Sequence, residues 1–181
     1  MTLRLPAWER TLVRSDLWLA VIGSGLLAAL ARVQVPVPWS PVPITGQTFG
    51  VLLLAGWWGP RLAVTSVAAY LLEGLLGLPV FASGGGLAAF LGPTGGYLLG
   101  FLAMAWVAGW LVQRWSRRGF WAYMLAFALA EVALYALGVV WLAGYVGWSR
   151  VWAAGVAPFL PGDTFKAVLA AWLVRELRPR I

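Results

Sequence analysis

The chain has 181 residues, of which 62% are hydrophobic and 10% charged, and its formal net charge is +7. Such a chain cannot cover an apolar core with a polar surface, which indicates a membrane protein, and its arginines flank apolar segments instead of forming a basic stripe, which argues against nucleic-acid binding. Cysteine and histidine are absent, so thiolate or imidazole metal sites and nucleophilic catalysis by Cys or His are excluded.

The first predicted span covers residues 17–32 and carries a small residue at every fourth position. Ala20, Ser24 and Ala28 form this stripe. Small residues at this spacing let a second helix approach closely. The stripe therefore predicts a packing face, either for another helix of this chain or for a partner protein.

A stiff loop follows, because four prolines within residues 34–43 prevent helix formation and favour extended chain. The second predicted span covers residues 44–58. Thr45 is expected to cap it, and Gln47 places an amide near the membrane surface. Gln47 is either a ligand contact or an ordinary interface residue.

The third predicted span covers residues 61–76 and contains Glu73 near its end. Residues 77–96 are rich in glycine but also carry apolar side chains, unlike a flexible polar linker. Non-helical chain near membrane depth is tolerated only where protein or water satisfies its backbone. We therefore expect a folded loop that covers a cavity.

The fourth and fifth predicted spans cover residues 96–113 and 119–142, and the fifth carries Glu131 near its middle. Residues 144–158 are read as a second irregular loop, and the sixth span covers residues 162–177. No linker divides the chain, so a single membrane domain over residues 1–181 is expected. Both glutamates are candidates for ligand contact or for hydrogen-bonded residues within the bundle.

Asp163 and Lys166 stand at the start of the sixth span. Lys166 is the only lysine and Asp163 one of two aspartates. Three residues apart on a helix, they share one face. A charge in a bilayer costs a few kcal/mol, so the pair is either a functional site or a self-satisfied ion pair at a helix end.

The distribution of arginines predicts which side of the membrane each loop occupies. With both termini in the cytoplasm, ten arginines fall inside and two, Arg32 and Arg150, fall outside. The ten are Arg4, Arg10, Arg14, Arg61, Arg114, Arg117, Arg118, Arg175, Arg178 and Arg180. The loops and the charged pair then lie on the outer side, which predicts a covered pocket open to the exterior.

Four motifs in this order resemble the signatures of the BioY family, the biotin-specific substrate-binding subunits of energy-coupling factor (ECF) transporters. They are Pro41-Val-Pro-Ile-Thr-Gly-Gln-Thr48, Gly77-Leu-Pro-Val-Phe81, Gly92-Pro-Thr-Gly-Gly-Tyr-Leu-Leu-Gly-Phe101 and Pro161-Gly-Asp-Thr-Phe-Lys-Ala167. The resemblance covers nearly the whole chain. It implies an all-α membrane protein with six transmembrane helices, cytoplasmic termini and structured extracellular loops.

The resemblance also implies a function and its partners. It implies high-affinity capture of biotin at the outer face of a prokaryotic plasma membrane. Delivery would need a transmembrane coupling protein, the T component, and two ATPases of the ATP-binding-cassette type, with the stripe Ala20, Ser24 and Ala28 sliding on the T component. No metal or cofactor is implied.

Biotin offers two ureido N–H donors, one carbonyl, apolar rings and a carboxylate. We expect Asp163 to accept from a ureido N–H and Lys166 to donate to the ureido oxygen. Expected ligand contacts of the wall and lid are Tyr97, Phe81, Ser83, Gly84, Gly85 and Gln47. Two alternatives are the same fold binding thiamine or riboflavin, and a small membrane enzyme using Asp163 as acid or base.

Overall fold

The computed structural model describes residues 14–115 and 119–177, which form a helical bundle with one short sheet. Six helices occupy the predicted spans to within about one turn at each end. They are α1 (Arg14–Arg32), α2 (Gln47–Trp58), α3 (Pro60–Leu75), α5 (Gly95–Arg114), α6 (Phe120–Val146) and α8 (Leu160–Leu177).

By length and composition, two helices of the described residues, α5 and α6, could each cross a membrane. α5 is mostly buried within the bundle, whereas α6 presents large apolar side chains outward, among them Trp121, Val132 and Val140. Such a face needs an apolar solvent, as a helix at the lipid boundary does. Crossing by the other four helices stays a prediction.

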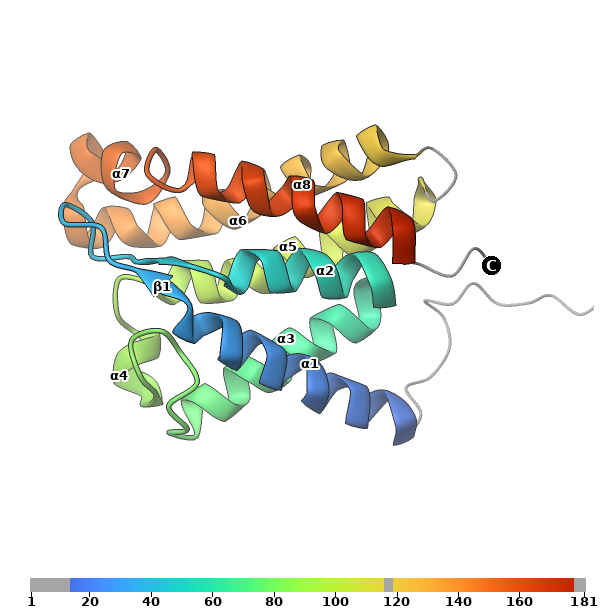
Figure 1. Ribbon diagram of the computed structural model, residues 1–181. Helices are drawn as coiled ribbons and strands as arrows, with labels where there is room; N and C mark the ends of the chain where they lie inside the picture. The colour runs from blue at the N-terminus through green and yellow to red at the C-terminus, as the bar shows by residue number, and fades with distance from the viewer. Residues whose placement is uncertain (1–13, 116–118, 178–181) are drawn as a thin grey trace, which may run out of the picture.

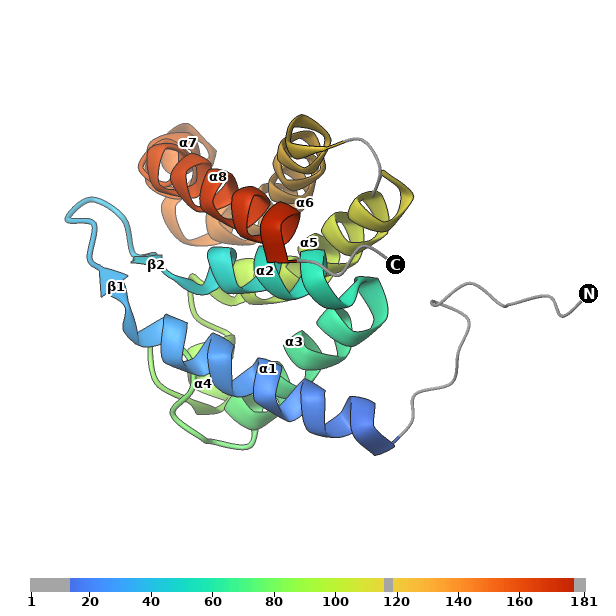
Figure 2. The ribbon, with the colours of Figure 1, turned by 45° about the vertical axis from the view of Figure 1, so that its right-hand side comes forward.

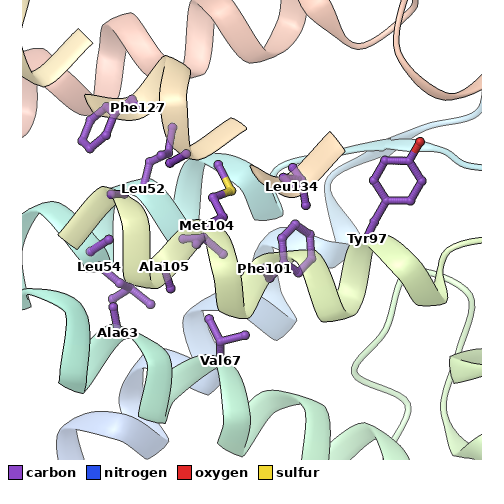
Figure 3. Packing of buried hydrophobic residues seen from close by; sticks show 14 of the residues in the cluster. Leu52, Leu54, Ala63, Val67, Tyr97, Phe101, Met104, Ala105, Phe127 and Leu134 are labelled. Atoms are coloured by element: carbon purple, nitrogen blue, oxygen red, sulfur yellow. The ribbon is translucent and has the colours of Figure 1, made fainter. Parts of the chain in front are cut away.

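α5 lies in the middle of the bundle and contacts α2, α3 and α6. α1 packs on α3 along one side, and α8 packs on α2 and α6 along the other (Figure 1). Buried side chains of α2, α3 and α6, including Leu52, Val67 and Leu134, meet Phe101 and Met104 of α5 (Figure 3). This packing holds the helices that carry the charged pair and its neighbours at fixed positions.

The shorter elements gather at one end of the bundle, and the end of α8 lies at the other (Figures 1 and 2). They are the antiparallel strands β1 (Gln34–Val35) and β2 (Ile44–Thr45), the one-turn helix α4 (Gly86–Phe90) and α7 (Trp148–Gly155). The proline-rich residues 36–43 connect the two strands.

Two local predictions are wrong. Residues 144–158 are largely helical, because α6 continues to Val146 and only Gly147, at φ +79°, separates it from α7. The N-cap of α2 is Gly46, not Thr45, although the Thr45 hydroxyl accepts a hydrogen bond from the backbone N–H of Gln47 at 3.4 Å.

Several arginines used to predict the topology lie outside the described residues. They are Arg4, Arg10, Arg117, Arg118, Arg178 and Arg180. The assignment of the termini to the cytoplasm therefore stays a prediction.

Candidate functional site

The carboxylate of Asp163, in the first turn of α8, is buried and held by three side-chain donors. The hydroxyl of Thr48 donates to Oδ1 at 2.9 Å, and the hydroxyl of Tyr135 donates to Oδ2 at 2.5 Å. Lys166 Nζ donates to Oδ1 at 2.8 Å. Three helices, α2, α6 and α8, thus converge on one carboxylate, which stabilises its charge away from water.

Lys166 lies one turn further along α8, on the same face as Asp163. Besides the ion pair with Asp163, its Nζ donates to Thr48 Oγ1 at 3.1 Å. Its side chain is 16% exposed. The predicted pair therefore joins a buried carboxylate to a half-buried ammonium, and Thr48 bridges the two charges.

The pair forms part of the lining of a pocket with about 570 Å³ of unfilled space, including its mouth. The rest of the lining is mostly apolar and aromatic, with a few polar groups: Val42, Pro43, Thr45, Gln47, Thr48, Phe81, Ala82, Ser83, Thr94, Tyr97, Leu98, Phe101, Leu134, Tyr135 and Phe159. A charged pair, Asp163 and Lys166, within mostly apolar walls suits a small ligand that has a polar ring edge and an apolar body.

Two aromatic side chains predicted from the sequence form the walls. Phe81 is buried and packs edge-on against Tyr70, with ring centroids 5.3 Å apart. Tyr97 of α5 packs against Phe159, which directly precedes α8, and their ring centroids lie 6.3 Å apart. Tyr97 extends from α5 beyond Phe101 (Figure 3). The structure brings both rings to the same pocket as the charged pair.

Gln47 also reaches the pocket, where its amide ties α2 to α3. Its Nε2 donates to the hydroxyl of Tyr70 at 2.6 Å, and its Oε1 accepts from the hydroxyl of Thr45 at 3.0 Å. The Tyr70 hydroxyl in turn donates to the carbonyl of Val80 at 3.2 Å. This chain of hydrogen bonds fixes the loop that carries Phe81.

Two hydrogen bonds attach the outer elements to one another above the pocket. Ser40, in the proline-rich segment, donates to the carbonyl of Ala154 in α7 at 2.7 Å. The hydroxyl of Tyr97 donates to the carbonyl of Gly155 at 2.6 Å. These two bonds link the proline-rich segment, through α7, to the pocket wall, and we call the proline-rich segment together with α7 the roof.

The three predicted ligand contacts in the glycine-rich loop, Ser83, Gly84 and Gly85, differ in their position relative to the pocket. Ser83 is exposed and lines both the pocket and an adjoining outer groove. Gly85 lines only the groove, and its backbone lies so close to Leu78 that a Cβ would come 2.2 Å from the Leu78 carbonyl oxygen. Gly84, at φ +114°, exchanges backbone hydrogen bonds with Phe81 and closes a tight turn. The two glycines thus shape the loop, and of these three predicted residues only Ser83 lines the pocket.

The outer groove contains about 910 Å³ of unfilled space and shares Pro43, Ala82, Ser83 and Thr94 with the pocket. It is bounded by the proline-rich segment on one side and by the glycine-rich loop with α4 on the other. Its position makes it the way into the pocket.

The small-residue stripe of α1 faces α3 within the bundle. Ala20 and Ser24 are buried and Ala28 is half-buried. The hydroxyl of Ser24 donates to the carboxylate of Glu73 on α3 at 2.7 Å. In this structure the stripe packs internally, and Ala20 and Ser24 are not available to a partner protein.

Neither Glu73 nor Glu131 lines the pocket. Glu73 is engaged at the contact of α1 with α3, whereas Glu131 has a buried oxygen, Oε1, without a hydrogen-bond partner. Among the residues described, no cluster of acidic side chains suits a metal ion.

Thr48 and Tyr135 are the partners of Asp163 that sequence reasoning missed. They contact Asp163 across 115 and 28 residues of chain, so no local spacing reveals them. A signal was present for each: Thr48 ends the Pro41 to Thr48 motif, and Tyr135 lies one turn from Glu131 on the same helical face.

These features define a helical membrane protein that binds one small ligand in a pocket near this roof. Residues 6–181 match the BioY family. The chain belongs to this family, which confirms the resemblance seen in its motifs.

Individual relatives agree. The chain is 40% identical over 163 residues to the biotin transporter BioY of Thermotoga maritima, covering 87% of this chain and 95% of the relative. It is 37% identical over 156 residues to a probable biotin transporter BioY of Pyrococcus horikoshii, covering 84% and 92%. A crystal structure of the S-component for biotin from an ECF-type ABC transporter superposes with a TM-score of 0.82 at 27% identity, covering 94% of this chain and 96% of that one.

Proposed function

We propose that this protein is the biotin-binding S component of an ECF-type importer, which captures biotin from outside the cell. The observation that carries the proposal is the Asp163–Lys166 ion pair in the lining of a mostly apolar and aromatic pocket. The family and its biotin-transporting relatives support biotin as the ligand. The names of these relatives describe transporters, not enzymes.

The pocket offers what the ring system of biotin requires. Asp163 provides a carboxylate oxygen for one ureido N–H group, and Lys166 provides an N–H for the ureido carbonyl. Phe81, Tyr97 and Phe159 provide aromatic surface for the fused rings. A rigid ring held at two points favours biotin over acyclic acids, since a ligand lacking either group leaves a buried partner unpaired.

The membrane arrangement belongs to the same proposal. The six long helices cross the plasma membrane of a prokaryotic cell, with both termini in the cytoplasm and the roof outside. In this orientation the groove opens to the exterior, and the charged pair lies near the outer end of α8. The excess of arginines on the side assigned to the cytoplasm supports this orientation.

A T component and two ATPases supply the energy for delivery, because this chain has no nucleotide-binding motif of its own. Contact of Ala20, Ser24 and Ala28 with the T component would require α1 to separate from α3. The small residues that α1 exposes outward in the structure are Gly25 and Ala29. Single Trp substitutions at Ala28, on the predicted stripe, and at Ala29, on the exposed face, followed by co-purification with the T component, show which of the two faces of α1 binds it.

Isothermal titration of the purified protein with biotin tests the proposal. We expect tight binding in the wild type and a loss of more than tenfold, about 1.4 kcal/mol, in Asp163→Asn and in Lys166→Ala. Arg175→Ala is the matched control, because it removes an exposed cation from the same helix. Unchanged binding in both pocket variants would contradict the site assignment.

Competition titrations separate biotin from the other candidate ligands. Thiamine or riboflavin binding more tightly than biotin would assign the same fold to another vitamin. Chemical conversion of biotin by the purified protein alone would instead revive the enzyme alternative.

A further inference from the structure

The outer groove continues the pocket in the direction away from the charged pair. Asp163 and Lys166 line the pocket but do not line the groove. The residues that line both are Pro43, Ala82, Ser83 and Thr94. A ligand whose ring is held by the charged pair therefore directs its side chain toward these shared residues and the groove beyond them.

The side chain of biotin ends in a carboxylate, which needs either a cation or water. Among the described residues that line the pocket, Lys166 is the only cation, and it lies at the ring end. The described lining of the groove contains no charged side chain, and its polar members, Gln34, Ser83 and Thr94, are neutral. Arg32 does not line it. The ligand carboxylate is therefore solvated by water that enters through the groove.

Small residues line the groove on the side of the glycine-rich loop and α4. They are Ala82, Ser83, Gly85, Ala88, Ala89 and Gly92. The opposite side is lined by Pro41 and Pro43 of the proline-rich segment. None of these side chains is long enough to close the groove, so it has room for more atoms than the carboxylate itself.

Hydrogen bonds from α6 and α7 hold both walls of the groove in place. On α6, Trp141 Nε1 donates to the carbonyl of Gly92 at 2.9 Å, and the hydroxyl of Tyr145 donates to the carbonyl of Leu91. On the other wall, Ser40 bonds the proline-rich segment to α7. We therefore expect the groove to stay open beside an occupied pocket.

We propose that this protein also binds biotin that carries an amide-linked extension on its carboxyl group. The ring lies in the pocket and the extension lies in the groove. Biocytin, in which the carboxyl group is joined to the side-chain amine of lysine, is a member of this ligand class. The amide is neutral, and hydroxyl groups or water can pair with its N–H and carbonyl. This inference rests on the proposed function and widens the class of ligands that the same site takes.

Titration of the purified protein with biotin, biotinamide and biocytin tests whether the carboxylate is needed. We expect both derivatives to bind within about tenfold of biotin, because amidation removes no charged partner. A carboxylate paired with a buried cation would instead lose about hundredfold on amidation. Biotinamide tests the loss of charge alone, and biocytin adds the length of the extension.

A tryptophan placed in the groove tests where the extension lies. Ala88 is exposed on α4 and lines only the groove. We expect Ala88→Trp to weaken biocytin at least tenfold more than biotin, since the indole occupies the space of the extension. Leu87→Trp is the matched control, because this neighbouring residue is also exposed but lines neither cavity. It should leave the ratio of the two affinities unchanged.

Pro41→Trp repeats the test from the opposite wall, where Pro41 is exposed and lines only the groove. It gives an independent reading if Ala88→Trp does not fold. We expect the same selective loss of biocytin binding.

The wild-type titration with biotin separates the two levels of the argument. If biotin does not bind, the proposed function fails. If biotin binds but either derivative binds more than tenfold more weakly, the inference is overturned and the proposed function stands. The same holds if the folded groove variants leave the ratio of biocytin to biotin affinity at its wild-type value.

Discussion

Thr48 connects the two charges of the pocket, since its hydroxyl donates to Asp163 and accepts from Lys166. Replacing it with valine keeps the shape of the side chain but removes both hydrogen bonds. We expect the dissociation constant for biotin to rise about tenfold, because each such bond contributes about 1 kcal/mol and the pair loses its alignment. Titration with biotin measures this effect.

Thr65→Val is the control for that substitution. Its hydroxyl donates only to the carbonyl of Arg61 within α3, and the residue does not line the pocket. Binding should therefore equal that of the wild type. Equal binding in the Thr48 variant too would mean that the ion pair holds its geometry without the bridge.

The site could be predicted in part at the level of single residues. Asp163 and Lys166 were accessible because their spacing on one helix is local and a charge within an apolar chain is conspicuous. Thr48 and Tyr135 were not, because their role depends on how α2, α6 and α8 pack. The same packing places Ser24 against Glu73, which spacing alone left undecided between an internal and an external contact.

At the level of elements, the end of α3 determines where the pocket wall stands. A Cβ at Gly74 would lie 2.0 to 2.5 Å from three ring carbons of Phe81, which is buried against Tyr70. Gly74→Ala must therefore push the ring and its loop away. Overpacking of this kind costs about 1–3 kcal/mol, and we expect biotin binding to weaken about tenfold or more.

Gly25→Ala is the matched control for Gly74→Ala. It is also a helical glycine, but a Cβ there has no atom within 4 Å. It should gain about 1 kcal/mol in helix stability and leave biotin binding unchanged. Thermal unfolding and titration of both variants test the comparison, and wild-type binding in Gly74→Ala would show that the Phe81 ring is not a fixed wall.

Helix positions followed from apolar length and from turn residues, as at Gly59–Pro60, where glycine adopts φ +81° and proline starts α3. α7 was missed because its eight residues, which follow Gly147 and end at Gly155, are too few for a periodic signal and resemble a loop in composition. Its tertiary contacts explain why it is helical. Val151 and Ala154 are buried against the bundle, and Ser40 bonds to its last turn.

At the scale of the whole molecule, the hydrogen bond from Ser40 to the carbonyl of Ala154 suggests that the roof controls how fast biotin dissociates. Ser40→Ala removes the hydroxyl that links the proline-rich segment to α7. We expect biotin to dissociate several-fold faster, since the roof opens more readily, while the pocket contacts themselves are unchanged. Stopped-flow measurement of dissociation tests this, and an unchanged rate would mean that the roof does not limit release.

The orientation in the membrane can be tested because the chain contains no cysteine. Ser83 and Glu176 are both exposed, and they lie at the roof and near the end of α8 respectively. With cytoplasmic termini, Ser83→Cys should react with a membrane-impermeant maleimide in intact cells, whereas Glu176→Cys should react only after permeabilisation. Biotin should slow labelling of Ser83→Cys, because this position lines the pocket and its entrance groove. Labelling of Glu176→Cys in intact cells would reverse the orientation and place the pocket on the cytoplasmic side, where it could not capture an external ligand.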